Sequence, residues 1–259
     1  MDYQDIIYKK KDGIARITIN RPDKLNAFRT ETLMEMTKAL EDVEIDRTVG
    51  VLVLSGAGGR AFCVGGDAGE SSGAGYKPEL GAYVRRVHDM IRKVPIPVIA
   101  AVRGYAIGGG HVFHIICDLT IASEDSIFGQ VGPRVGSFDA GYGAGYLARL
   151  VGEKKAREIW FLCERYTAHE ALQMGMVNKV VSPDKLEEEV EAWCQKILAL
   201  SPTALKVLKA AFNRESDHIA GSEALAMASL WQYYQTDEAA EGKQAYLEKR
   251  KTDFSKFRK

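Results

Sequence analysis

The apolar residues in the first quarter of the chain follow two different spacings. β-Branched runs at residues 6–8 and 14–19, separated by Lys-Asp-Gly, predict an opening hairpin. Residues 31–43 place an apolar side chain at every third or fourth position, which predicts a helix with one buried face. The apolar run at residues 49–54 predicts a buried strand. A strand, a helix and a second strand in that order favour a parallel crossover.

The same alternation continues through the middle of the chain. Residues 80–92 have helical spacing, and residues 98–102 form an apolar run. A glycine-rich turn then leads into a helix at 108–115, and a further apolar run follows at 119–122. The repetition predicts an α/β fold with parallel strands. Residues 69–81 interrupt it with Gly, Ser and Ala and little periodicity, so we expect a mobile active-site loop there.

The last third is predicted to be helical. Thr167 and Glu170 match a capping box, and the Ser-Pro pairs at 182–183 and 201–202 match an N-cap residue followed by proline. The expected helices cover residues 185–200, 203–213, 220–234 and 237–251. We therefore expect a core over residues 1–200 and a helical region over residues 201–259, of the kind that packs on a neighbouring subunit.

Composition narrows the kinds of partner. The chain has 259 residues, 46% of them hydrophobic, which is enough for one large core. Lys and Arg together number 35, as do Asp and Glu, so the net charge is +0 and no overall field attracts nucleic acid or an acidic membrane. The four cysteines include no CxxC pair, so we expect reduced, mostly buried thiols. The N-terminus lacks the apolar segment of a signal peptide, and no apolar run approaches the roughly 20 residues that span a bilayer, so the expected location is cytoplasmic.

Two glycine-rich segments follow predicted strands. Residues 61–67 are Ala-Phe-Cys-Val-Gly-Gly-Asp, and residues 104–110 are Gly-Tyr-Ala-Ile-Gly-Gly-Gly. Glycines at a strand-to-helix junction let the backbone approach a ligand, and a helix N-terminus presents unpaired N–H donors toward it. Either segment alone is also typical of a tight turn. Together they could direct two donors at one carbonyl oxygen.

With Asn-Arg-Pro-Asp-Lys-Leu-Asn-Ala-Phe at residues 20–28, the paired segments resemble the crotonase (enoyl-CoA hydratase/isomerase) superfamily over nearly the whole chain. The resemblance implies an enzyme with a ββα spiral core, a C-terminal helical trimerisation layer and assembly as a homotrimer or homohexamer. It implies a CoA thioester as substrate, no covalently bound cofactor, and oxyanion donors at the N–H groups of Gly66 and Gly109. The implied CoA contacts are Lys24, Leu25 and Ala27.

The chain departs from the hydratases of that superfamily at two positions. Hydratases carry a Glu shortly after the Gly-Gly-Gly run and a second Glu in the following loop, where they handle the water. Those positions are Val112 and Gly132 in this chain. Without either carboxylate, simple hydration of an enoyl-CoA is not expected.

Residues 128–143 and 154–160 resemble one branch of the superfamily. It contains 1,4-dihydroxy-2-naphthoyl-CoA synthase, which closes a ring by a Dieckmann-type condensation, and 2-ketocyclohexanecarboxyl-CoA hydrolase, which opens one. Both make or break a C–C bond beside a thioester.

The branch implies roles for particular residues. Ser137 and Asp139 match its polar pair near the reacting carbon, and Tyr76 and Tyr234 match its two active-site tyrosines. Lys249 matches a lysine that reaches the CoA phosphates of a neighbouring subunit. The pocket that holds bicarbonate in many of the synthases, in place of a carboxylate base, is matched by Gln130, Gly132 and Trp160.

Several of these residues have a structural explanation as well. Asp139 lies in a glycine-rich turn, where Asp commonly caps N–H groups. Tyr234 and Trp160 are of types that usually pack in helices. His111 and His114 are three residues apart on one helix, but no third ligand is placed near them, so we expect packing and no metal site.

Two chemistries stay open for the branch. Residues 104–181 are more like the ring-closing synthase, whereas residues 68–73 lack the synthase's basic stretch, and Val131 and residues 233–242 are nearer the hydrolase. Because substrate choice in this fold depends on loops, we favour ring-opening hydrolysis of an alicyclic β-keto acyl-CoA. The alternative is ring closure of o-succinylbenzoyl-CoA, a step of menaquinone biosynthesis.

A further hypothesis is a crotonase-fold protein that binds RNA without catalysis. The zero net charge and the lack of an Arg-rich stretch argue against nucleic acid as a partner.

Overall fold

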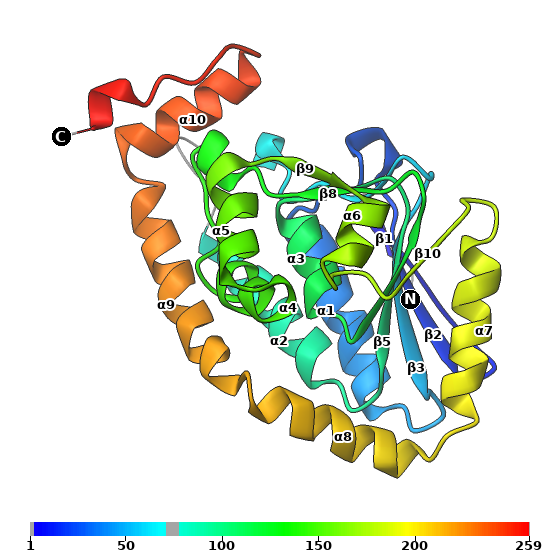
Figure 1. The fold of residues 1–259 in the computed structure, drawn as a ribbon. Helices are drawn as coiled ribbons and strands as arrows, with labels where there is room; N and C mark the ends of the chain where they lie inside the picture. Colours follow the sequence, from blue (N-terminus) through cyan, green and yellow to red (C-terminus); the bar gives the residue numbers. More distant parts are fainter. Residues whose placement is uncertain (1–2, 71–77, 259) are drawn as a thin grey trace.

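The structure, a computed structural model, describes residues 3–70 and 78–258. Its larger β-sheet has the strand order β1-β2-β3-β5-β7-β10 (Figure 1). The strands are β1 (Ile6–Lys11), β2 (Ile14–Ile19), β3 (Val51–Gly56), β5 (Val98–Val102), β7 (Leu119–Ser123) and β10 (Lys179–Val181). Strands β1 and β2 pair antiparallel, as the predicted hairpin, and the other pairs are parallel, which confirms the predicted parallel core.

A smaller sheet has the order β4-β6-β8-β9. Its strands are β4 (Ala61–Cys63), β6 (Tyr105–Ile107), β8 (Ile127–Gly129) and β9 (Arg165–Thr167). Strands β4, β6 and β8 pair in parallel, and β9 closes the sheet antiparallel. The chain passes from β3 through β4 into one helix, and from β5 through β6 into the next, so each repeat is strand, strand, helix. This repeat is the predicted ββα spiral core.

The helices cover both faces of the larger sheet. They are α1 (Thr30–Ile45), α2 (Pro78–Lys93), α3 (Gly109–Ile116), α4 (Leu147–Val151), α5 (Glu153–Leu162), α6 (Ala168–Gln173), α7 (Leu186–Leu198), α8 (Pro202–Arg214), α9 (Asp217–Tyr233) and α10 (Asp237–Leu247). The first four residues of β3 are apolar and buried on both faces: Leu52 and Leu54 join the core cluster with α1 and α3, whereas Val51 and Val53 join the cluster with α7. In Figure 1, α8 and α9 form an arc around the core and lead to α10.

The predicted helix starts are confirmed at α6 and α8 and wrong at α7. The Thr167 hydroxyl accepts a hydrogen bond from the Glu170 N–H, and the Glu170 carboxylate accepts one from the Thr167 N–H, as in a capping box. The Ser201 hydroxyl accepts a hydrogen bond from an N–H of the first turn of α8. The Ser182-Pro183 pair instead opens a turn, and α7 begins only at Leu186.

Other expectations had mixed outcomes. Helix α2 begins at Pro78 and α9 at Asp217, both earlier than predicted, and α10 ends at Leu247. The four cysteines are free and buried, as expected. Among the helices that the structure describes, none is long and apolar enough to cross a membrane. The division into residues 1–200 and 201–259 stays a prediction.

Glycines allow the smaller sheet and α3 to approach closely. A Cβ on Gly110 would lie 2.0 Å from the carbonyl oxygen of Cys63, and one on Gly109 would lie 2.7 Å from the ring of Phe28. Only a residue without a side chain can occupy such a position unless the backbone moves. The first turn of α3 therefore packs directly on the β4 segment.

Gly110→Ala should destabilise the protein by about 1–3 kcal/mol or more, because the added methyl group overlaps the Cys63 carbonyl. The matched control is Gly221→Ala in α9, where a Cβ would meet nothing within 4 Å. It should raise stability by up to about 1 kcal/mol, because alanine is the better helix former. Urea unfolding at one fixed protein concentration measures both. Equal stabilities would contradict the direct contact.

Candidate active site

The loop at residues 20–28 is tied to the first glycine-rich segment. The Asn26 side chain, which is fully buried, donates to two backbone carbonyls at 2.7 and 2.9 Å, one of them that of Ala61. The Arg21 guanidinium donates to the Asp67 carboxylate at 2.8 Å. These bonds satisfy the polar groups that the loop buries and hold it against the segment that follows β4.

The two glycine-rich segments lie side by side. The Phe28 N–H donates to the Gly65 carbonyl at 2.8 Å, and Phe28 forms a β-bridge with Gly66. A Cβ on Gly65 would lie 3.1 Å from the backbone nitrogen of Gly109. Gly109 is the first residue of α3, so its N–H has no acceptor within the helix. The predicted oxyanion donors, Gly66 and Gly109, thus lie on adjacent backbone segments, and their catalytic role stays a prediction.

Asp139 lies in the loop between β8 and α4. Its Oδ1 accepts hydrogen bonds from the N–H groups of Gly141 at 2.9 Å and Gly143 at 3.1 Å, so it does cap a turn. Burial, and next the negative charge of Glu223, raise the pKa of Asp139 to about 6, although His88 and the two N–H groups act against them. Such a carboxylate is ionised at neutral pH yet more basic than an ordinary one, as a general base requires.

A buried ion pair lies beside Asp139. Nδ1 of His88 and Oε1 of Glu223 are 2.9 Å apart, and the two side chains are 1% and 0% exposed. The second oxygen of Glu223 accepts a hydrogen bond from the Tyr142 N–H at 2.8 Å. Burial opposes both charges, but the bond between the two groups outweighs it, so the pKa of His88 is raised and that of Glu223 is lowered.

His88, Asp139 and Glu223 form a compact cluster. One ligand atom of each lies within 4.8 Å of the others, and no other such group occurs among residues 3–70 and 78–258. Glu223 already bonds to His88 and to a backbone N–H group, and Asp139 accepts hydrogen bonds from backbone N–H groups, so this bonding accounts for the cluster without an ion.

Ser137 and Tyr234 are far apart in the chain and share a hydrogen bond of 2.7 Å. Burial raises the pKa of Tyr234 to about 12, so its hydroxyl stays protonated at neutral pH. Ser137 also lines a cavity of about 330 Å³. The aromatic residues along this cavity are Phe138, Tyr233, Phe254 and Phe257. Tyr76, the other tyrosine proposed for the site, lies outside the described residues.

The donors of the expected anion pocket are occupied within the protein. The Gln130 amide donates to Nδ1 of His111 at 3.1 Å and to the Gly108 carbonyl at 3.4 Å. The Trp160 indole donates to the Gly143 carbonyl at 2.8 Å. Burial lowers the pKa of His111 to about 3, which leaves its ring neutral and able to accept from Gln130.

Neither of the two positions that match the hydratase carboxylates holds a carboxylate in this chain, and at Gly132 the arrangement leaves no room for one. A Cβ on Gly132 would lie 2.7 Å from the Ser137 carbonyl and 3.1 Å from the Trp160 ring, so a glutamate there would need the loop to move. Val112 is fully buried in the core cluster. Asp139 is then the carboxylate that the loop offers.

The residues expected to hold CoA are only partly placed by a single chain. Lys24 is exposed, Leu25 has a left-handed backbone with φ 51°, and the Ala27 N–H donates to the Lys24 carbonyl at 3.0 Å. Lys249 is exposed just after α10. Their contacts with CoA stay predictions.

The sequence reasoning missed His88 and Glu223, although a signal was present. His88 shares the buried face of α2 with Val87 and Ile91, and Glu223 follows Ile219 at helical spacing on the buried face of α9. An ionisable residue on an otherwise apolar helix face indicates a buried partner.

Comparison with known proteins places the chain in a family. The family model for enoyl-CoA hydratase/isomerase matches residues 9–257. The chain belongs to this family. Its members are enzymes of the crotonase superfamily that act on CoA thioesters, which agrees with the expected class of substrate.

Solved structures of the family have the same fold. An enoyl-CoA hydratase from Mycobacterium avium subsp. paratuberculosis K-10 is 28% identical, with a TM-score of 0.86 over 98% of this chain and 100% of that one. An enoyl-CoA hydratase/carnithine racemase from Magnetospirillum magneticum is 31% identical, with a TM-score of 0.78 over 98% of this chain and 96% of that one. These matches support acyl-CoA chemistry and do not distinguish the branches of the superfamily.

Asp139→Asn should make the folded enzyme more stable above pH 6. The folded state binds the Asp139 proton more tightly than the unfolded chain does, so the charged carboxylate costs stability that accumulates as the pH rises from 3.8 to about 6 and is fully present above that. The gain at pH 8 is at most about 3 kcal/mol and should shrink as the pH falls toward 4. Thermal unfolding of wild type and variant at both pH values measures it. A gain that is the same at pH 4 and pH 8 would contradict a raised pKa.

Proposed function

We propose that this enzyme hydrolyses the C–C bond of an alicyclic β-keto acyl-CoA of the 2-ketocyclohexanecarboxyl-CoA type, and so opens the ring. The observation that carries the proposal is that the site has a carboxylate at a different position from the hydratases. Val112 and Gly132 occupy the positions of the hydratase glutamates, and Asp139, with a pKa near 6, lies beside the Ser137–Tyr234 pair. A site arranged in this way suits attack of water on a carbonyl group better than addition of water to a double bond.

The proposed reaction uses one base and one oxyanion site. Asp139 takes a proton from water while the water oxygen bonds to the ring ketone carbon. The C–C bond to the α-carbon then breaks, and its electron pair forms a thioester enolate, which regains a proton at carbon. The product is an acyclic dicarboxylate carried as a CoA thioester. We assign stabilisation of the enolate oxygen to the N–H groups of Gly66 and Gly109, and loss of one such donor typically costs about 2.7–4 kcal/mol of barrier.

The cavity beside Ser137 fits an apolar ring. Phe138 and Tyr233 pack against each other, with 5.4 Å between their ring centroids, and form one aromatic wall. Phe254 and Phe257 of the tail add further aromatic surface, and Glu238 and Arg258 also line the cavity. The Tyr234 hydroxyl, protonated at neutral pH, is suited to donate a hydrogen bond to the ring ketone. We assign to Tyr76 either the same hydrogen bond to the ring ketone or the donation of the proton that the enolate carbon regains.

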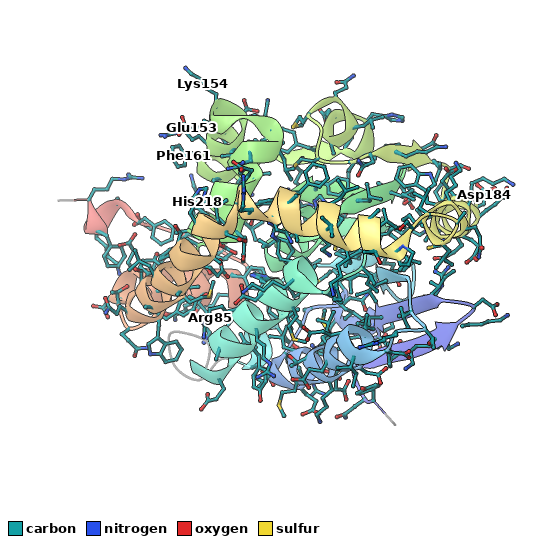
Figure 2. All side chains as sticks on the ribbon, turned by 90° about the horizontal axis from the view of Figure 1, so that it is seen from below. Arg85, Glu153, Lys154, Phe161, Asp184 and His218 are labelled. Carbon is teal, nitrogen blue, oxygen red and sulfur yellow. The ribbon has the colours of Figure 1, made fainter. Side chains whose placement is uncertain are left out.

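CoA binding and assembly complete the proposal. We assign the CoA contacts to Lys24, Leu25 and Ala27, with Lys249 reaching the CoA phosphates of a neighbouring subunit in a homotrimer or homohexamer. Exposed apolar side chains support an assembly, and they include Phe161, Val207, Leu208, Phe212 and Leu225. Figure 2 shows Phe161 on the outer surface of α5.

The alternative is 1,4-dihydroxy-2-naphthoyl-CoA synthase, with bicarbonate as the base. The close approach of Gly132 to Trp160 favours it, because both belong to the expected bicarbonate pocket. The occupied donors of Gln130 and Trp160 argue against it, since bicarbonate would have to displace these internal hydrogen bonds. Ring opening is therefore the better-supported function.

Mass spectrometry of the enzyme incubated with 2-ketocyclohexanecarboxyl-CoA should show the gain of one water, giving pimeloyl-CoA. A parallel incubation with o-succinylbenzoyl-CoA should leave that thioester unchanged. Loss of water from the second substrate, with no change in the first, would establish the synthase instead.

Asp139→Asn should lower ring opening by about 10²–10⁴-fold, because the variant cannot accept the proton of water. The matched control is Asp184→Asn, since Asp184 is exposed in the turn before α7 (Figure 2) and should leave the rate unchanged. Equal rates for wild type and Asp139→Asn would remove Asp139 from the mechanism.

A further inference from the structure

The His88–Glu223 ion pair is costly for a protein that needs only to pack two helices. Replacing a buried ion pair with apolar residues is often neutral or stabilising, so its presence calls for an explanation beyond stability. The ion pair and Asp139 come from three elements that meet at one place: His88 from α2, Glu223 from α9 and Asp139 from the loop before α4. The pair therefore lies where the proposed base is held.

One turn of backbone connects the pair to Asp139. Consecutive N–H groups alternate between the two carboxylates: Gly141 and Gly143 donate to Asp139, and Tyr142 between them donates to Glu223. A Cβ on Gly141 would lie 1.8 Å from Oε2 of Glu223, so the turn rests directly on this carboxylate. Any displacement of Glu223 must displace the N–H groups that orient Asp139.

We propose that His88 and Glu223 are positioning residues for Asp139, whose turn they hold in place and whose charge they adjust. The consequence for catalysis rests on the proposed function. The positioning itself does not, because it concerns only how three side chains of the folded protein interact.

The charges predict opposite effects for the two members of the pair. Glu223 is a like charge that disfavours the ionised Asp139, and His88 carries the opposite charge that favours it. Removing His88 leaves two carboxylates sharing one site, which raises the pH at which the second proton leaves. Removing the charge of Glu223 takes away the larger of the two influences on Asp139, and any charge that His88 loses in turn offsets only part of this lowering.

Other charged or titratable groups face this cluster, and none of them is changed in the variants proposed below. They are Arg85, Asp89 and Arg92 of α2, Tyr142 in the loop and Tyr234 at the end of α9. Arg85 is exposed at the surface (Figure 2), where salt screens its charge, so its influence on Glu223 is weakened at moderate ionic strength.

The test is a pH titration of the Asp139 carboxyl carbon by ¹³C NMR, in protein with labelled aspartate and in buffer with EDTA. The signal that is lost in Asp139→Asn assigns the resonance. Glu223→Gln, which can keep the hydrogen bond from Tyr142, should lower the midpoint by about one pH unit. His88→Gln should raise it by about one pH unit or more. A general loosening of the site would not move the two midpoints in opposite directions.

The matched control is Asp118→Asn, which weakens the 2.6 Å ion pair between the buried Lys209 of α8 and Asp118 in the segment just before β7. It should lower stability and leave the Asp139 midpoint unchanged. If His88→Gln does not fold, Glu223→Gln alone decides. An unchanged or raised midpoint in Glu223→Gln overturns the proposal.

Turnover separates this inference from the proposed function. With 2-ketocyclohexanecarboxyl-CoA, the acid limb of kcat/KM should shift with the NMR midpoint in each variant. If the midpoints move as predicted but no variant and no wild-type enzyme opens the ring, the positioning role stands and the proposed function fails.

Discussion

Direct backbone contact between the β4 segment and the first turn of α3 is the constraint on which the rest of the structure depends. The contact exists because Gly65, Gly109 and Gly110 carry no side chain at points where a Cβ would meet the other segment at 2.0–3.4 Å. It directs the N-terminus of α3, where N–H groups lack helical acceptors, toward the strand that precedes Gly66. The buried Asn26 and the Arg21–Asp67 bond then fix the neighbouring loop to the same place.

The proposed reaction also requires a carboxylate that is held in one orientation and has a raised pKa. The C-terminal helices help to supply it. Helix α9 contributes Glu223, which supports the turn around Asp139, and Tyr234 at its end bonds to Ser137. Residues 201–259 therefore complete the candidate site as well as presenting apolar surface to solvent. A truncation that removes α9 would expose the turn at residues 139–143 and leave His88 without its partner.

The sequence predicted the parts of the fold whose pattern is regular. The apolar runs that became β3, β5 and β7 are buried on both faces, and α1 has a clear helical spacing, so both were recognisable. Strands β4, β6, β8 and β9 were not, because three residues are too few for a periodic pattern and three of these strands lie within or beside glycine-rich segments. Ser182-Pro183 matched a helix start locally, yet the chain forms a turn there first.

The site was predictable in a similarly uneven way. Resemblance to a family brought the two glycine-rich segments together and assigned Ser137 and Tyr234 to one site, but the hydrogen bond between these two residues was not predicted. The raised pKa of Asp139 did not, because it depends on burial and on Glu223, 84 positions later in the numbering of the chain. The family match covers residues 9–257, whereas the reaction depends on a few side chains that the match does not distinguish.

The most direct test of the account is the pH dependence of kcat/KM for wild-type enzyme acting on 2-ketocyclohexanecarboxyl-CoA. If Asp139 is the base, kcat/KM should rise with its ionised fraction, with a midpoint near pH 6, and level off above it. A rate that is independent of pH between 4.5 and 7.5, in a range where the substrate itself does not ionise, would contradict the account.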